Sequence, residues 1–233
     1  MRLIEPQTGR QTLAEQAYDS LRDSIISLKL QPGQMVYEAD SAQLLGMSRT
    51  PVREAFKMLL MEDLIEVLPQ RGARIALISQ QKVEETRFVR ASLEVSAFRK
   101  AAREWKQGEQ HYHHIEQQIE RVLEEQKRAA GDMDIMLFLH WDEAFHRLII
   151  SQAHNPTLMK VIYHMRGHLN RLRYLMLKEL NLINDIIKEH ETLFQATRTN
   201  NESETIRLLE QHLSKMSEEL PIISAKFPHY FRE

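Results

Sequence analysis

Four side chains in the second half of the sequence have the types and the spacing of a metal site. Asp142 and His146 are four residues apart in "WDEAFH", so on a helix their side chains can reach the same point. His190 and His212 lie eleven residues before and after a connection centred near residue 201. Antiparallel helices would place them at the same depth, roughly 16 Å from the turn. One carboxylate and three imidazoles suit Zn2+, Ni2+, Mn2+ or Co2+, and spacing does not choose among these ions.

The same residue types also have ordinary uses in helical proteins. The chain has 11 histidines, and a single histidine in a helix is more often a surface or packing residue than a ligand. His164 and His168 are also four residues apart, and His140 lies close to Asp142, so these are alternative ligands. Spacing alone therefore leaves the four-residue site as one interpretation among several.

The composition restricts the classes of protein that hold such a site. The 233 residues include no cysteine, which excludes disulfides and thiolate ligands. Hydrophobic residues make up 42% and glycine and proline number 7 each, as in a mostly helical globular protein. Apolar runs fall short of the roughly 20 residues that span a bilayer, and the N-terminus lacks a signal-peptide core. We therefore expect a cytoplasmic protein with no membrane segment.

A second group of residues with a chemical use lies near the N-terminus. Arg49, Arg53 and Lys57 are spaced by four, which places three cations on one face of a helix. Ser48 is a suitable N-cap for that helix, and Pro51 falls in its first turn. The chain as a whole has 31 Lys and Arg against 33 Asp and Glu, so this positive charge is local.

The elements around this cationic helix predict a winged helix-turn-helix. Helices are expected over 11–29, 38–45 and 49–61. The runs "LIEVLP" and "ARIALI" then bracket "PQRG", which predicts a hairpin with Gly72 near its tip. The second helix of such a motif fits the major groove of DNA. The alternative is a solvated helix face on which acids such as Glu54 pair with the cations.

From residue 79 onward the sequence pattern is wholly helical. Helices are expected at about 79–105, 112–129, 132–152, 157–179, 182–198 and 202–220, with Pro221 ending the last one. Short connections between antiparallel helices predict a bundle. The fold class is therefore mainly α, with a winged helix-turn-helix in residues 1–78 and an all-α antiparallel bundle in residues 79–233, including a C-terminal tail.

The run "SRTPVREA" at 48–55, followed by "PQRG" at 69–72, resembles the DNA-binding domain of GntR-family bacterial transcription regulators. Two departures from that pattern are Asp63, where a glycine is common, and Ala39, where some members have a basic residue that contacts DNA. Arginines can bind guanine or phosphate, and short hydroxyls can donate to phosphate. The candidate DNA contacts, including the wing that the resemblance implies, are Ser48, Arg49, Thr50, Arg53, Arg71 and Gly72.

The second half of the chain resembles the FCD-type effector domain of the FadR-like branch of that family. The similar motifs are "RASLE" at 90–94, "DEAFHRLI" at 142–149, "AHNPTL" at 153–158, "EH" at 189–190 and "HL" at 212–213. The resemblance implies a divalent metal, with Zn2+ expected first, held by Asp142, His146, His190 and His212. It also implies a small carboxylic acid at the metal.

Two further residues are candidates for binding that acid. Arg90 matches the arginine that assists effector binding in the family, although it could instead pair only with Glu94 four residues on. Asn155 is a candidate at the edge of the pocket, or else a residue of the turn that starts a helix.

These features together predict a transcription regulator rather than an enzyme. A homodimer would place two recognition helices about one DNA turn apart on a palindromic operator. Repression relieved by the acid is the default for such a protein. The alternatives are a metal sensor without an organic effector, and a metallohydrolase, because Asp/His sites also activate water. Two observations oppose the hydrolase interpretation: the sequence offers no convincing general base beside the ligands, and a hydrolase would have no use for a helix-turn-helix.

Overall fold

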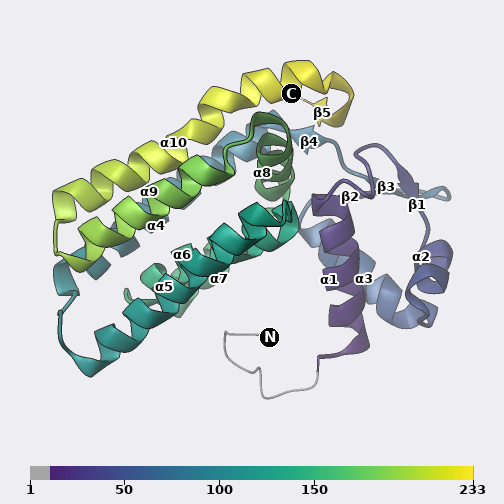
Figure 1. Ribbon diagram of the computed structural model, residues 1–233. Helices are drawn as coiled ribbons and strands as arrows, with labels where there is room; N and C mark the ends of the chain where they lie inside the picture. Colours follow the sequence, from purple (N-terminus) through teal and green to yellow (C-terminus); the bar gives the residue numbers. More distant parts are fainter. Residues whose placement is uncertain (1–10, 233) are drawn as a thin grey trace. The chain divides into compact units, whose positions relative to one another are not determined.

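The computed structural model describes residues 11–232, apart from the side chains of residues 163 and 164 (Figure 1). The chain folds as two compact units, Met1–Leu77 and Ile78–Glu233. In the part of the chain that is described, none of the helices has the length and apolar character needed to cross a membrane.

The first unit is a winged helix-turn-helix. Its elements are α1 (Leu13–Ile26), β1 (Met35–Val36), α2 (Glu38–Leu45), α3 (Arg49–Met61), β2 (Ile65–Leu68) and β3 (Gly72–Ile75). The wing has three antiparallel strands in the order β1-β3-β2. The expected hairpin is therefore present, and the two-residue strand β1, which is too short to give a sequence pattern, is added to its edge.

The core of this unit fixes α3 against α1. Leu21 and Ile25 of α1 pack with Val52, Phe56 and Leu59 of α3, and all five side chains are buried. Burial of such a side chain contributes about 1.5–3 kcal/mol, so the apolar face of α3 is held inward. The opposite face, which carries the cations, is exposed.

Two residues with positive φ lie at the C-terminal ends of α2 and α3. Gly46 ends α2 at φ +63, and Asp63 follows α3 at φ +55. The left-handed conformation explains why a glycine is common at the second position, and aspartate is one of the residues that tolerate it.

The second unit is a helical bundle with one small strand pair. Its elements are β4 (Ile78–Ser79), α4 (Gln80–Glu104), α5 (Gln110–Gly131), α6 (Ile135–Ser151), α7 (Pro156–His164), α8 (Gly167–Leu180), α9 (Ile183–Arg198), α10 (Glu202–Lys226), a 3-10 turn (Pro228–Tyr230) and β5 (Phe231–Arg232). In Figure 1, α10 runs beside α9, and α10 packs against both α9 and α4.

The expected single helix over 157–179 is wrong, because the structure divides it into α7 and α8. Arg166 lies between them, at φ −82 and ψ −3. Its guanidinium is buried and lies 3.4 Å from both Glu94 and Glu143. These ion pairs, with the low helix propensity of Gly167, explain a break at this position.

The prediction that Pro221 ends the last helix is also wrong, since α10 continues to Lys226 with Pro221 inside it. An interior proline costs about 3 kcal/mol. Leu220 and Ile223, on either side, are buried in the bundle, and each contributes about 1.5–3 kcal/mol. Beyond α10, the tail pairs in parallel with the start of the unit, with Ile78 opposite Phe231.

Candidate metal centre and nucleic-acid interface

Asp142, His146, His190 and His212 meet inside the second unit. One potential ligand atom from each of the four lies within 4.8 Å of the others. The rings of His190 and His212 are 4.9 Å apart, and those of His146 and His212 are 5.2 Å apart. Asp142 and His146 share one face of α6, and His190 and His212 lie at the same level on α9 and α10. The four side chains therefore meet as the sequence spacing predicted.

Nδ1 of each imidazole in this cluster lies close to an oxygen atom of another side chain. Nδ1 of His146 lies 2.9 Å from Glu94, and Nδ1 of His212 lies 2.8 Å from Glu189. Nδ1 of His190 lies 3.0 Å from the amide oxygen of Gln126, whose Nε2 in turn donates to the carbonyl of Trp141. Metal-binding histidines usually have such an outer partner, which fixes the ring and leaves Nε2 for the metal.

The charge state of the cluster suits a divalent cation. Burial lowers the pKa of His146 to about 4 and the pKa of His190 well below its usual value, so both rings are neutral. Burial alone would raise the pKa of Asp142, but the Arg173 guanidinium holds it well below its usual value. A carboxylate and neutral imidazoles are the forms that bind metal.

Several atoms of the cluster point to a missing partner. The Nε2 atoms of His146 and His190 are buried and have no hydrogen-bond partner among the described residues. Buried polar atoms of this kind are rare unless water or an ion satisfies them. The donor set, its protonation and these unsatisfied atoms fit a metal such as Zn2+.

A cavity adjoins the cluster at His212. It is partly open to solvent, and Arg90 and Arg173 are among its lining residues. Arg90 donates from Nε to Glu94 at 2.5 Å, and Arg173 approaches Asp142 with Nη2 at 2.6 Å. Nη2 of Arg90 and Nη1 of Arg173 are buried and have no hydrogen-bond partner in the described part of the chain. Arg90 therefore makes the predicted ion pair with Glu94 and also lines the cavity.

The other candidates from the sequence lie elsewhere. Asn155 is exposed, and its side chain accepts the backbone N–H of Leu158 at 3.1 Å, so it caps α7 and is not among the described residues that line the cavity. His168 accepts from the backbone of Ser79 at 3.2 Å, away from the cluster. His140 lines a separate hollow. The side chain of His164 falls outside the described residues.

Four residues around the cluster were not predicted as parts of the site. Gln126, Glu189 and Arg166 support it from outside, and Arg173 contacts Asp142. A signal exists for Glu189, which directly precedes His190 in "EH". Arg173 lies in "RLRY" on a helix whose other residues are mostly apolar, and a buried arginine in such a helix needs a carboxylate partner.

The candidate DNA contacts lie on the surface of the first unit. Ser48, Arg49 and Thr50 are exposed at the start of α3, and Ser48 occupies the N-cap position without a side-chain cap bond. Arg53 pairs through Nε with Glu38 at 3.1 Å, and Lys57 pairs with Glu54 at 2.9 Å. The pairing expected for a solvated face is thus present at two of the three cations, in exposed pairs that contribute little to stability.

The wing presents Arg71 and Gly72 at the turn between β2 and β3. Arg71 is exposed, and Gly72 has φ +94. A Cβ atom at Gly72 would lie 2.7 Å from the ring of Tyr37. Glycine is therefore required here both by the backbone conformation and by the close aromatic ring.

Two family models match the two units. Residues 85–215 match the FCD domain, and residues 13–75 match the bacterial regulatory proteins of the gntR family. The HTH-type transcriptional repressor RspR of Escherichia coli (strain K12) is 27% identical over 223 residues, covering 96% of this chain and 95% of that protein. A probable D-xylose utilization operon transcriptional repressor of Paenarthrobacter nicotinovorans is 31% identical over 151 residues, 65% of this chain and 64% of the relative.

Solved structures show the same fold. E. coli McbR/YncC superposes with a TM-score of 0.76 at 19% identity, over 93% of this chain and 99% of that one. A putative GntR transcriptional regulator from Rhodococcus sp. RHA1 gives a TM-score of 0.73 at 18% identity, over 89% of this chain and 97% of that one.

Proposed function

Because the chain belongs to the GntR family of bacterial regulators and carries an FCD domain, it is a DNA-binding transcription regulator and not an enzyme, and we propose that a metal and a small carboxylate control its binding to DNA. The observation that carries this proposal is the four-residue Asp/His cluster beside a cavity lined by two arginines, each of which has a buried nitrogen atom without a hydrogen-bond partner among the described residues.

The first unit binds the operator through the exposed start of α3 and the wing. Arg49 and Arg53 reach base edges or phosphates, with Ser48 and Thr50 donating to the backbone. Arg71 and Gly72 approach the backbone or the minor groove from the wing. Nε of Arg53 is paired with Glu38, so its two terminal nitrogens remain for a bidentate contact.

Asp142, His146, His190 and His212 hold the divalent metal, with Zn2+ as the first expectation and Ni2+, Mn2+ or Co2+ as alternatives. When bound, the metal supplies a positive centre that attracts a carboxylate. Arg90 and Arg173 then position that carboxylate with the nitrogens that protein groups leave unpaired. Glu94, Gln126 and Glu189 orient the imidazoles.

The acid regulates DNA binding by favouring one arrangement of a dimer. A homodimer places two α3 helices on the halves of a palindromic operator. An effector that binds one arrangement more tightly shifts the population toward it, and the effect on DNA affinity cannot exceed the difference in effector affinity between the two arrangements. The relatives named as repressors support repression, and the acid relieves it in this proposal.

Operator binding measured under three conditions tests the proposal. An operator selected from random duplexes is titrated with the metal-loaded protein, with the chelator-treated protein, and with the metal-loaded protein plus a panel of organic acids. A change in affinity that requires both metal and acid supports the proposal. Dependence on metal with no response to any acid would instead identify a metal sensor.

A further inference from the structure

The cavity beside the metal cluster extends along three helices rather than ending at the metal. Its lining comes mainly from α8, α9 and α10. Because α9 and α10 are antiparallel around residue 201, Glu189 is level with His212, and Leu182 is level with Glu219. These pairs mark two ends of the cavity, two helical turns or roughly 10 Å apart.

The end at His212 is lined by cationic side chains. Arg90 and Arg173 line the cavity, and each has one buried nitrogen without a hydrogen-bond partner among the described residues. Lys215 also lines the cavity, but its ammonium pairs with Glu189. This end can therefore hold one carboxylate, with two guanidinium groups and the metal around it.

The middle of the cavity is apolar. A hydroxyl placed among these side chains would lose its water without gaining a hydrogen-bond partner. The walls are formed by Met176, Leu177, Leu182, Ile186, Leu213 and Met216.

The far end carries one unpaired acceptor. Oε2 of Glu219 is buried and has no hydrogen-bond partner among the described residues. Burial raises the pKa of Glu219, although Lys215 acts in the opposite direction. Such an atom needs a donor, and a ligand in the adjoining cavity can supply one.

We propose that the effector is a monocarboxylic acid with an apolar body and a hydrogen-bond donor, a hydroxyl or an amine, at the end opposite the carboxylate. This inference rests on the proposed function, since it places the carboxylate at the metal. It predicts that sugar acids and tricarboxylates bind poorly, because the apolar walls cannot satisfy their additional polar groups.

A ligand series on the zinc-loaded full-length protein tests the inference. Calorimetric titration compares ω-hydroxyoctanoate, ω-aminooctanoate, octanoate, gluconate and citrate. We expect octanoate to bind at least about tenfold more tightly than gluconate or citrate, and an ω donor to improve affinity further by about tenfold. Tighter binding of gluconate or citrate than of every octanoate derivative would overturn the apolar class while leaving regulation by a carboxylate intact.

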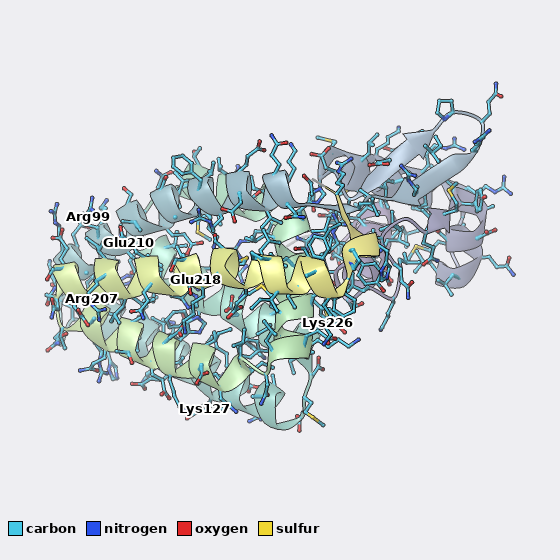
Figure 2. The ribbon with its side chains drawn as sticks, turned by 90° about the horizontal axis from the view of Figure 1, so that it is seen from above. Arg99, Lys127, Arg207, Glu210, Glu218 and Lys226 are labelled. Carbon is cyan, nitrogen blue, oxygen red and sulfur yellow. The ribbon has the colours of Figure 1, made fainter. Side chains whose placement is uncertain are left out.

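A variant of the far end tests the donor separately. Glu219→Met removes the acceptor, so the preference for an ω donor over plain octanoate should fall to within about twofold. Glu218→Met is the matched control, because Glu218 is exposed on α10 (Figure 2) and does not line the cavity. Retention of the full preference in Glu219→Met would overturn the far-end contact. If no acid in the series changed operator binding at all, the proposed function itself would fail.

Discussion

Arg173 and Asp142 connect the metal cluster to the adjoining cavity. Nη2 of Arg173 lies 2.6 Å from Oδ2 of Asp142, and the same arginine lines the cavity and keeps Nη1 unpaired. One guanidinium therefore contacts the carboxylate of the proposed metal site and lines the cavity proposed for the effector. Metal and effector binding should accordingly depend on each other, and the dependence must be reciprocal.

Substitution of Arg173 by methionine should weaken both metal and carboxylate binding. Without the cation, Asp142 loses a partner that favours its ionised form, and outer partners of ligands are typically worth 10–100-fold in metal affinity. Competition titrations with Zn2+ and a chromophoric chelator measure this loss. Arg128→Met is the control, because Arg128 is exposed on α5 and pairs with neighbouring Glu125 on the same helix. Equal zinc affinity in both variants would show that Arg173 does not contribute to metal binding.

Removal of one ligand imidazole should abolish tight metal binding. His212→Ala leaves three ligands, and we expect a loss of more than about a hundredfold in affinity for Co2+, which reports tetrahedral or octahedral coordination by its absorption. His113→Ala is the control, since His113 is exposed and contacts Gln117 at 3.1 Å. A cobalt spectrum in His212→Ala identical to that of the unmodified protein would exclude this histidine from the ligand set.

Gln126 should matter to the metal although it is not a ligand. It is fully buried and links His190 to the carbonyl of Trp141. Gln126→Leu keeps the volume but leaves the Nδ1–H of His190 without an acceptor, so zinc affinity should fall by about 10–100-fold. Thermal unfolding of the metal-free protein, measured in parallel, separates this effect from a general loss of stability. Unchanged zinc affinity in a folded variant would contradict the orienting role.

Arg49 and Arg53 should contribute more to operator binding than Lys57. A bidentate bond to a base edge is worth about 1–3 kcal/mol, whereas removing a cation that binds only phosphate weakens binding to all sequences alike. Arg49→Ala and Arg53→Ala should therefore reduce both affinity and selectivity for the operator over random DNA in fluorescence-anisotropy titrations. Lys29→Ala, an exposed cation outside α3, is the control. Full operator affinity in the Arg49→Ala, Arg53→Ala double variant would refute DNA binding by this helix.

Local spacing predicted that the four Asp/His side chains meet, because their positions follow from helix periodicity. Asp142 and His146 need only one helix, and His190 and His212 need only one antiparallel turn. Arg173 and Gln126 could not be found in this way. Their roles depend on how α8 and α5 pack against α6 and α9, and no short-range pattern encodes that packing.

The two errors in the helix boundaries have the same origin. Pro221 is a strong local stop signal, but burial of Leu220 and Ile223 continues the helix through it. The break before Gly167 lacks a proline, and instead follows from the buried ion pairs of Arg166. Tertiary interactions thus continued a helix that the local sequence should end, and broke one that the local sequence should continue.

The wing should not tolerate a side chain at position 72. Gly72→Ala places a Cβ 2.7 Å from the ring of Tyr37 at a residue with φ +94. Strain at such a conformation costs about 1–3 kcal/mol, and relief would require Tyr37 or the wing turn to move. We expect a lower free energy of unfolding for the first unit, weaker operator binding, and unchanged zinc affinity. Denaturant unfolding and anisotropy titrations measure these quantities.

Gly131→Ala is the matched control for the wing substitution. Gly131 ends α5, and a Cβ there meets no atom within 4 Å. Alanine should be neutral or stabilising by up to about 1 kcal/mol, because it is the better helix former. Operator affinity should remain unchanged in this variant. If Gly72→Ala matched Gly131→Ala in both stability and operator binding, the close approach of Tyr37 to the wing would have no part in DNA recognition.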